Sequence, residues 1–325
     1  MSSISLNSFL STALSNSISE LRTQIADRAQ EATTGRQADL ISHLNGRIDH
    51  ALLGDKALQD NADDQARIEL RQIRLSLSEN AMGSIRDLTE GLSLEMQSAI
   101  GIEDVERQQT VATQAREALS EVLSRLNVRH GERYLFSGDA TATAPFQDAD
   151  ALLTDLQTIA AGAVDEADFA EQVQTYFDDP AGGFQTSFYQ GTQTASDGDA
   201  VLPNQGAFSD MFMGLSLMAL SAPGTVIPFA AVGTPAMDLA LERLDRGRTL
   251  LVDVEASIGI RQDSLLSELD LLGREKVLLT SSFQDLTGKD QYEAATQLKE
   301  LEANLEASYL LTSRLSNLSL LNYLR

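Results

Sequence analysis

Both ends of the chain place apolar residues at helical spacing. Near the N-terminus these positions alternate between spacings of four and three, which is typical of a coiled-coil or bundle helix. The positions are Leu14, Ile18, Leu21 and Ile25. The C-terminal segment has the same kind of stripe, with a phase shift at Ser308, at Leu298, Leu301, Leu305, Leu311, Leu315, Leu318 and Leu321. Each end therefore predicts a helix whose apolar stripe needs a partner.

Longer helical tracts lie between the two ends. Residues 45–98, 103–129 and 235–282 are rich in Leu, Ala, Gln, Glu and Arg, all good helix formers. Glycine-containing breaks separate the tracts, in "TTGRQADLISHLNG", "AIGIED" and "LTGKDQ". This pattern predicts a helical bundle.

The middle of the chain differs in composition. No Lys or Arg occurs from Tyr134 to Glu242, while acidic residues persist and Gly, Thr, Pro and aromatic residues cluster. We expect two short helices, at 151–161 and 166–177, with β-structure or loop elsewhere, then a buried helix at 207–220. The absence of basic residues favours a solvent-facing inserted domain.

Together these patterns predict a mainly α fold. Its core is a long helical bundle or coiled coil formed by the N- and C-terminal segments, with a small α+β inserted outer domain. The predicted parts are an N-terminal inner helix (1–44) that pairs with a C-terminal inner helix (286–325), a helical middle domain in two pieces (45–133 and 207–285), and the acidic insertion (134–206).

Composition narrows the possible partners. The chain has 325 residues, of which 42% are hydrophobic, enough to bury substantial cores. Asp and Glu total 48 against 24 Lys and Arg, for a formal net charge of -24, which disfavours nucleic acid and anionic membranes as partners. The absence of cysteine excludes disulfides and thiolate sites.

The N-terminus lacks the basic region and apolar core of a Sec signal peptide, so we expect any export to use another route.

One uncharged stretch, residues 211–237, has the length of a membrane span. Its prolines and glycines would break a spanning helix, and no Lys or Arg flanks it. We therefore expect no membrane span.

The sequence shows no pattern of catalytic, cofactor-binding or metal-ligating residues. The three histidines, His43, His50 and His130, are not part of a metal-binding motif. The segment "SDGDA" (196–200) lacks the spaced acids and terminal Glu of a calcium loop, and Gly182-Gly183 is not followed by the Lys of a phosphate loop. We therefore expect no cofactor, no metal and no enzymatic activity.

The two tips of the chain are almost uncharged. The first charged side chain is Glu20, and after Glu306 only Arg314 and Arg325 are charged. Charges repeated around a ring or helical array would be costly to bury, so neutral tips are typical of a close-packed wall of many subunits. We accordingly expect Leu14, Ile18, Leu21, Ile25, Leu301, Leu305, Leu311, Leu315, Leu318 and Leu321 to lie at a subunit interface. The alternative, a self-contained antiparallel bundle, accounts for the stripes but not for the missing charges.

Several motifs resemble the bacterial flagellin superfamily. They are the paired terminal helices, "EATTGRQADL" after the first helix and the ending "RLSNLSLLNYL". Within that superfamily, "RYLFSGDATATAPF" (133–146), "FYQGT" (188–192) and "GAFSDMFMGLSLMAL" (206–220) are most similar to the hook-associated protein 3 family of hook–filament junction proteins. The turn "RQADLISHLNG" departs from the longer turn of true flagellins.

The resemblance implies a structural role outside the cell. It implies uncleaved export through the flagellar type III channel, an export chaperone on the C-terminal helix, and incorporation into the flagellum. The implied partners are copies of the chain itself, flagellin and the hook-side junction protein. The favoured function is an adaptor that joins the hook-side junction to the filament. A minor flagellin that polymerises along the filament is the alternative. A third and more remote hypothesis is an enzyme whose acidic middle domain uses carboxylate side chains for hydrolysis.

Overall fold

The computed structural model describes residues 2–196, 198–203, 206–222 and 227–323. Over these residues the protein is mainly α-helical with a small two-stranded antiparallel sheet, which confirms the predicted fold class. The chain divides into two compact units: unit 1 contains Met1–Ala66 and Asp270–Arg325, and unit 2 contains Arg67–Leu269. Two long helices, α3 and α9, contribute residues to both units.

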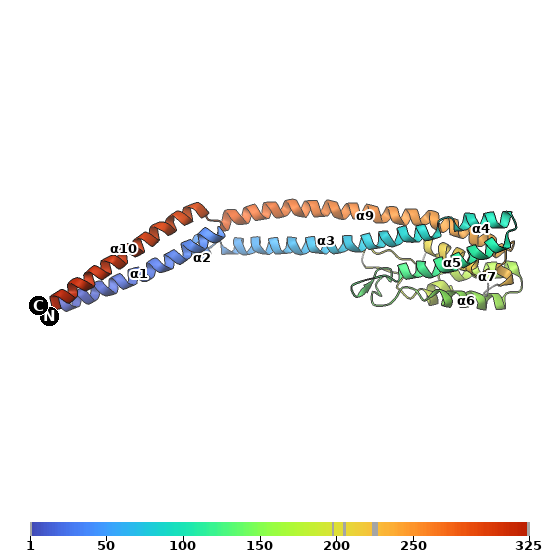
Figure 1. The fold of residues 1–325 in the computed structure, drawn as a ribbon, viewed down its shortest axis with the longest axis horizontal. Helices are drawn as coiled ribbons and strands as arrows, with labels where there is room; N and C mark the ends of the chain where they lie inside the picture. The colour runs from blue at the N-terminus through green and yellow to red at the C-terminus, as the bar shows by residue number, and fades with distance from the viewer. Residues whose placement is uncertain (1, 197, 204–205, 223–226, 324–325) are drawn as a thin grey trace. The chain divides into compact units, whose positions relative to one another are not determined.

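Unit 1 is built from the two ends of the chain. Its elements are α1 (Ser2–Thr34), α2 (Leu40–Leu44), the first part of α3 (Ile48–Thr89), the last part of α9 (Pro235–Thr287) and α10 (Gln291–Tyr323). Helices α1 and α10 lie side by side along their length (Figure 1). The first part of α3 packs on the last part of α9, where the buried Asn61 amide nitrogen donates to the carbonyl oxygen of Leu272 at 3.1 Å.

The local sequence explains both the start of α2 and the turn that joins it to α3. Asp39 caps α2 by accepting a hydrogen bond from the backbone N–H of Ser42 at 3.1 Å, and its hydrogen bonds with Ser42 lower the pKa of the Asp39 carboxyl. Helix α2 ends at Leu44, its C-cap residue Asn45 has φ +45°, and Gly46 follows at φ +91°. Asn and Gly are the residues that adopt this left-handed conformation most readily.

Unit 2 is a layered helical domain. Its elements, with parts of α3 and α9, are α4 (Leu92–Gly101), α5 (Val105–Leu126), β1 (Arg129–His130), β2 (Arg133–Tyr134), α6 (Ala149–Gly162), α7 (Glu166–Asp178), the π-helical turn η1 (Phe184–Phe188), α8 (Ala207–Ala219) and the 3-10 turn η2 (Pro228–Ala230). Helix α5 packs on α4, α6 and α8, and α7 packs on α6 and α8. Helices α4, α5, α6 and α7 are labelled in Figure 1. The sheet pairs Arg129 with Tyr134 and His130 with Arg133.

Helix α8 lies at the centre of unit 2, and all of its residues are buried. A cluster of five aromatic rings joins it to the acidic segment 134–206, with neighbouring ring centroids 5.1 to 6.1 Å apart. The rings are those of Phe146, Phe177, Phe184, Phe188 and Phe212. Segment 134–206 therefore shares one continuous core with α5 and α8.

Two glycines allow α8 and α9 to approach closely. A Cβ atom added to Gly214 would lie 2.7 Å from the carbonyl oxygen of Ala240, and one added to Gly247 would lie 2.8 Å from the carbonyl oxygen of Ala207. Both distances are far shorter than an ordinary contact. The crossing therefore depends on the absence of a side chain on each helix.

A buried charge network links α7, α8 and α9. Asp210 accepts a hydrogen bond from Arg243 Nη1 at 2.6 Å, and Arg243 Nη2 donates to Asp178 at 2.7 Å. Arg246 Nε lies 2.9 Å from the other oxygen of Asp210. Burial acts to lower the pKa of Arg243, but the carboxylates of Asp178 and Asp210 outweigh it and raise that pKa above its ordinary value.

The structure corrects one predicted helix and places the others closely. The tract expected to run through 45–98 is broken: α3 ends at Thr89 and α4 begins at Leu92. Gly91 between them has φ +80°, a conformation that a helix interior does not contain. The helices expected at 151–161, 166–177 and 207–220 are confirmed to within two residues by α6, α7 and α8.

Candidate assembly interface

The α1–α10 pair contains most of the predicted interface residues. Residues of the N-terminal stripe lie half-buried on α1, and two residues of the C-terminal stripe lie half-buried on α10. They are Leu14, Ile18, Leu21, Ile25, Leu301 and Leu305. Because each remains partly accessible, packing of one helix on the other covers only part of each stripe.

The rest of the predicted C-terminal stripe is placed differently. Leu311 is 56% exposed, and the neighbouring Leu310 is 60% exposed. The side chains of Leu315, Leu318 and Leu321 lie outside the described residues. The exposed leucines at 310 and 311 leave apolar surface on α10 that a further helix could cover.

A polar contact between α1 and α10 sets their relative register. Both Arg22 Nη2 and Arg22 Nε donate hydrogen bonds to the hydroxyl oxygen of Tyr309, at 2.6 and 3.1 Å. The Arg22 guanidinium carbon also lies 5.8 Å from the centre of the Tyr309 ring, within range of a cation–π contact. The sequence pattern of apolar positions did not reveal this contact.

A backbone bridge joins the end of α1 to the end of α9. The N–H of Gln37 donates to the carbonyl of Thr287, and the N–H of Lys289 donates to the carbonyl of Gly35, each at 2.9 Å. Gly35 has φ +66°, which explains the glycine in the turn "TTGRQ". Glu31 is buried beside this turn, where it pairs with Arg28 and accepts from the N–H of Ala38.

A second set of exposed apolar side chains lies on α2, α3 and α9 in unit 1, and the sequence analysis did not single these residues out. They are Ile41, Ile48, Leu52, Leu53, Leu271, Val277 and Leu278, and Leu278 is 71% exposed. A pair of helices can bury only one stripe of each member, so wider apolar faces remain uncovered. The signal was present as leucine pairs such as "ALLG" and "VLLT", which place apolar residues on two faces of one helix.

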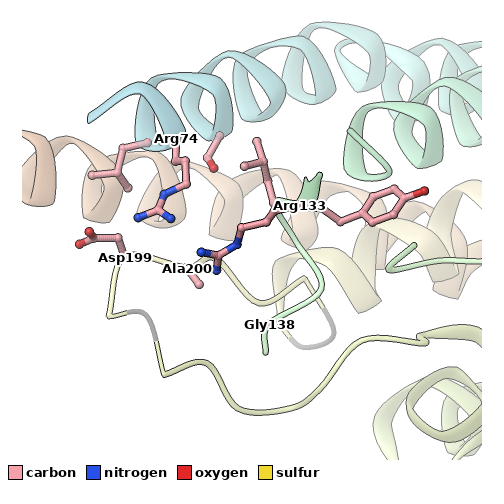
Figure 2. Close-up of a pocket in the computed structure, with 9 residues that line it drawn as sticks. Arg74, Arg133, Gly138, Asp199 and Ala200 are labelled. Atoms are coloured by element: carbon pink, nitrogen blue, oxygen red, sulfur yellow. The ribbon is translucent and has the colours of Figure 1, made fainter. Parts of the chain in front are cut away.

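A cavity in unit 2 lies beside the loop of Asp199 and Ala200 (Figure 2). The side chains of Arg74 and Arg133 point toward this loop. Nearby, Arg71 Nε donates to Asp199 Oδ2 at 2.5 Å. The contact of Arg71 with Asp199 ties this loop to α3, so the cavity reflects loop packing.

Two kinds of feature are absent from the described residues, a metal site and a membrane-spanning helix. Within them, no three His, Asp or Glu side chains come together as a metal site would require. None of the helices, over the residues described, has both the length and the apolar character needed to cross a membrane. The uncharged stretch 211–237 includes the part of α8 up to Ala219, the short turn η2 and the first residues of α9.

Comparison with protein families gives a match for the C-terminal part of the chain. Residues 241–324, which comprise most of α9 and α10, match the family described as the bacterial flagellin C-terminal helical region. This segment is flagellin-like. The resemblance to the flagellin superfamily is thereby confirmed for the segment that includes α10, the partner of α1. Among curated proteins, none matches the chain.

Two solved structures are also similar to this chain. One is a flagellar hook-associated protein from Vibrio parahaemolyticus, with 13% identity and a TM-score of 0.46, covering 73% of this chain and 95% of that one. The other is FlgL from Bacillus cereus, with 15% identity and a TM-score of 0.44, covering 72% of this chain and 96% of that one.

Proposed function

We propose that this protein is a structural subunit of the bacterial flagellum, an adaptor that joins the hook-side junction to the filament. The observation that supports it most is the pairing of the flagellin-like helix α10 with α1, which leaves apolar side chains partly uncovered on both helices. Helices with such surface gain stability when neighbouring subunits cover it. The role is structural, and the protein acts outside the cell after export.

The choice of an adaptor rests on the motif at 133–146. In the structure, this segment forms β2 and the loop that leads into the aromatic cluster at Phe146. Phe136, Ser137 and Phe146 of the motif are buried in unit 2, whereas Arg133 and Asp139 are exposed. These buried positions support a structural role for the motif. An adaptor has two unlike axial faces and stops after a thin layer, whereas a flagellin has matching faces and elongates.

The partners follow from this role. They are further copies of the chain, flagellin and the hook-side junction protein, with an export chaperone on the C-terminal helix before assembly. A minor flagellin remains the second candidate, because the family match is to the flagellin C-terminal region itself.

The two candidates differ in a deletion strain. We expect a strain that lacks this protein to keep its hooks, lose its filaments and release flagellin monomers into the medium. We also expect the purified protein not to elongate filaments from flagellar seeds. Electron microscopy of the deletion strain and of the seeded reaction measures both outcomes. Normal filaments in the deletion strain, or long filaments made of this chain alone, would establish the minor flagellin instead.

A further inference from the structure

Helix α4 in unit 2 exposes one large apolar side chain, Leu94, on its outward face. Leu92, Met96 and Ala99 are buried on one face, whereas Leu94 on another is 66% exposed. Glu95 is the one charged residue in this ten-residue helix. Leu94 lies on this face beside the exposed polar residues Glu95, Gln97 and Ser98, and no other described part of this chain covers it.

A groove runs between α4 and the first turns of α9. Its α4 side combines apolar and small residues: Ser93, Leu94, Gln97, Ile100 and Gly101. Its α9 side carries Leu241 and three acidic residues, Asp238, Glu242 and Asp245. The groove thus combines apolar residues with one acidic wall, and none of its lining residues is basic.

The acidic wall has a regular spacing. Asp238, Glu242 and Asp245 follow one another at four and three residues, so they share one face of α9. Asp238 lies in the first turn, where the helix dipole itself favours an acid, but Glu242 and Asp245 lie beyond it. Among the described residues, Asp245 has only a distant ion pair with Arg248, at 3.9 Å, and no ion pair involves Glu242.

We propose that this groove binds a basic amphipathic helix of a partner protein. The apolar face of that helix covers Leu94 and Ile100, and its Arg or Lys residues, spaced at four and three, face the three acids of α9. Helix α4 is ten residues long, about 15 Å, so the bound segment spans about three turns. The charge of the wall selects a basic partner, and the exposed leucine requires an apolar one. The proposal does not depend on the adaptor role.

A designed peptide tests the groove directly in the full chain. The probe is a fluorescently labelled helical peptide of about 18 residues with Arg at i, i+4 and i+7 and Leu on the adjoining positions. A scrambled peptide of identical composition, with its arginines spread around the helix, reports non-specific attraction to an acidic protein. We expect the patterned peptide to bind more tightly than the scrambled one by fluorescence anisotropy, with an affinity that falls as salt is raised.

Matched variants locate the binding site. The groove variant Glu242→Gln/Asp245→Asn should bind the patterned peptide about tenfold more weakly, and Leu94→Gln should also weaken it. The control variant Glu117→Gln/Glu171→Gln removes the same charge from exposed positions on α5 and α7 and should bind like the wild type. Thermal melting confirms that each variant is folded.

Three outcomes would overturn the proposal. The first is equal binding by the groove and control variants, which would mean that only net charge matters. The second is equal affinity for the patterned and scrambled peptides. The third is concentration-dependent self-association of the wild type, lost in the groove variant by analytical ultracentrifugation, which would make a second copy of this chain the occupant. None of these measurements involves filament assembly, so their result is separate from that of the deletion strain.

Discussion

At the residue scale, Asp210 shows how a single buried charge is stabilised. Its side chain is 1% exposed and faces Arg243 and Arg246 from the neighbouring helix α9. A buried ion pair adds little net stability by itself, because desolvation offsets the attraction. Loss of one partner is costly, however, since it leaves the other charge buried without compensation.

We predict that Asp210→Asn lowers the free energy of unfolding by about 3 kcal/mol. Urea denaturation followed by circular dichroism measures this change. The control is Asp178→Asn, which removes the other carboxylate bound by Arg243 at a position where the side chain is 43% exposed. We expect the control to cost at most about 1 kcal/mol, since water can replace an exposed partner. Equal losses in the two variants would contradict the importance of burial.

Asp139 gives a pH-dependent contact. The backbone N–H of Ser196 donates to Asp139 Oδ1 at 2.7 Å, and this hydrogen bond is the main reason that the pKa of Asp139 lies below its ordinary value of 3.8. A carboxyl with a lowered folded-state pKa stabilises the fold above its unfolded pKa. That contribution is lost as the pH falls through the lowered value.

We therefore predict that the contact between Asp139 and Ser196 is intact at neutral pH and loosens as the pH falls through the lowered pKa of Asp139. Hydrogen exchange at the Ser196 amide, measured across this range and corrected for the intrinsic rate, should show protection that disappears on acidification. In Asp139→Asn the protection should no longer depend on pH in this window. Unchanged protection of the wild type at low pH would show that the carboxylate is dispensable.

At the element scale, the crossing of α8 and α9 depends on glycine. A Cβ atom on Gly214 would lie 2.7 Å from Ala240 O and 2.8 Å from the backbone nitrogen of Leu244, so the backbones would have to move apart. Gly259, also within α9 in unit 2, has no atom within 4 Å of an added Cβ. The two positions separate the effect of packing from that of helix propensity.

We predict that Gly214→Ala destabilises unit 2 by about 1–3 kcal/mol, because the added methyl group overpacks the helix crossing. Gly259→Ala should instead stabilise the protein by up to about 1 kcal/mol through higher helix propensity. Differential scanning calorimetry of the two variants measures these opposite shifts in Tm. A stabilising effect at both positions would show that α8 can move away from α9 without cost.

At the scale of the whole molecule, we expect assembly to depend on apolar residues that the folded chain leaves exposed. Leu278 contributes little to the stability of the folded chain because it is 71% exposed. The same side chain can be buried when another subunit covers unit 1. Replacing such an exposed leucine should therefore impair assembly while leaving the stability of the monomer almost unchanged.

We predict that Leu278→Asp changes the stability of the isolated chain by less than about 0.5 kcal/mol and prevents its incorporation into the flagellum. We expect the same of Leu315→Asp and Leu318→Asp. The matched control is Val164→Asp, at an 87% exposed position in the acidic segment, which should still be incorporated. Thermal melting and immunoblotting of sheared flagella measure the two properties. A sharp fall in Tm for Leu278→Asp would place that leucine in the chain's own core.

Sequence alone predicted most helices, because helix formation follows from local spacing and local breakers. The stripes at Leu14 and Leu301, the helices α6, α7 and α8, and the turn at Gly35 could all be located in this way. The break at Gly91 was missed, since a single glycine within a helical tract is compatible with continuation or with an end. The predicted interface residues remain a prediction, with six of them half-buried in the α1–α10 pair.

By itself, then, the sequence determined the helical class, the uncharged tips and the flagellin resemblance, all of which depend on residues near one another in the chain. Only the tertiary structure decided which apolar residues are covered. Leu265 and Leu278 both lie on α9, yet Leu265 is 2% exposed and Leu278 is 71% exposed. The tertiary structure also brought Asp210 to Arg243 and left Leu94 on α4 exposed. Burial depends on neighbours that are distant in sequence, and helical periodicity carries no information about where those neighbours lie.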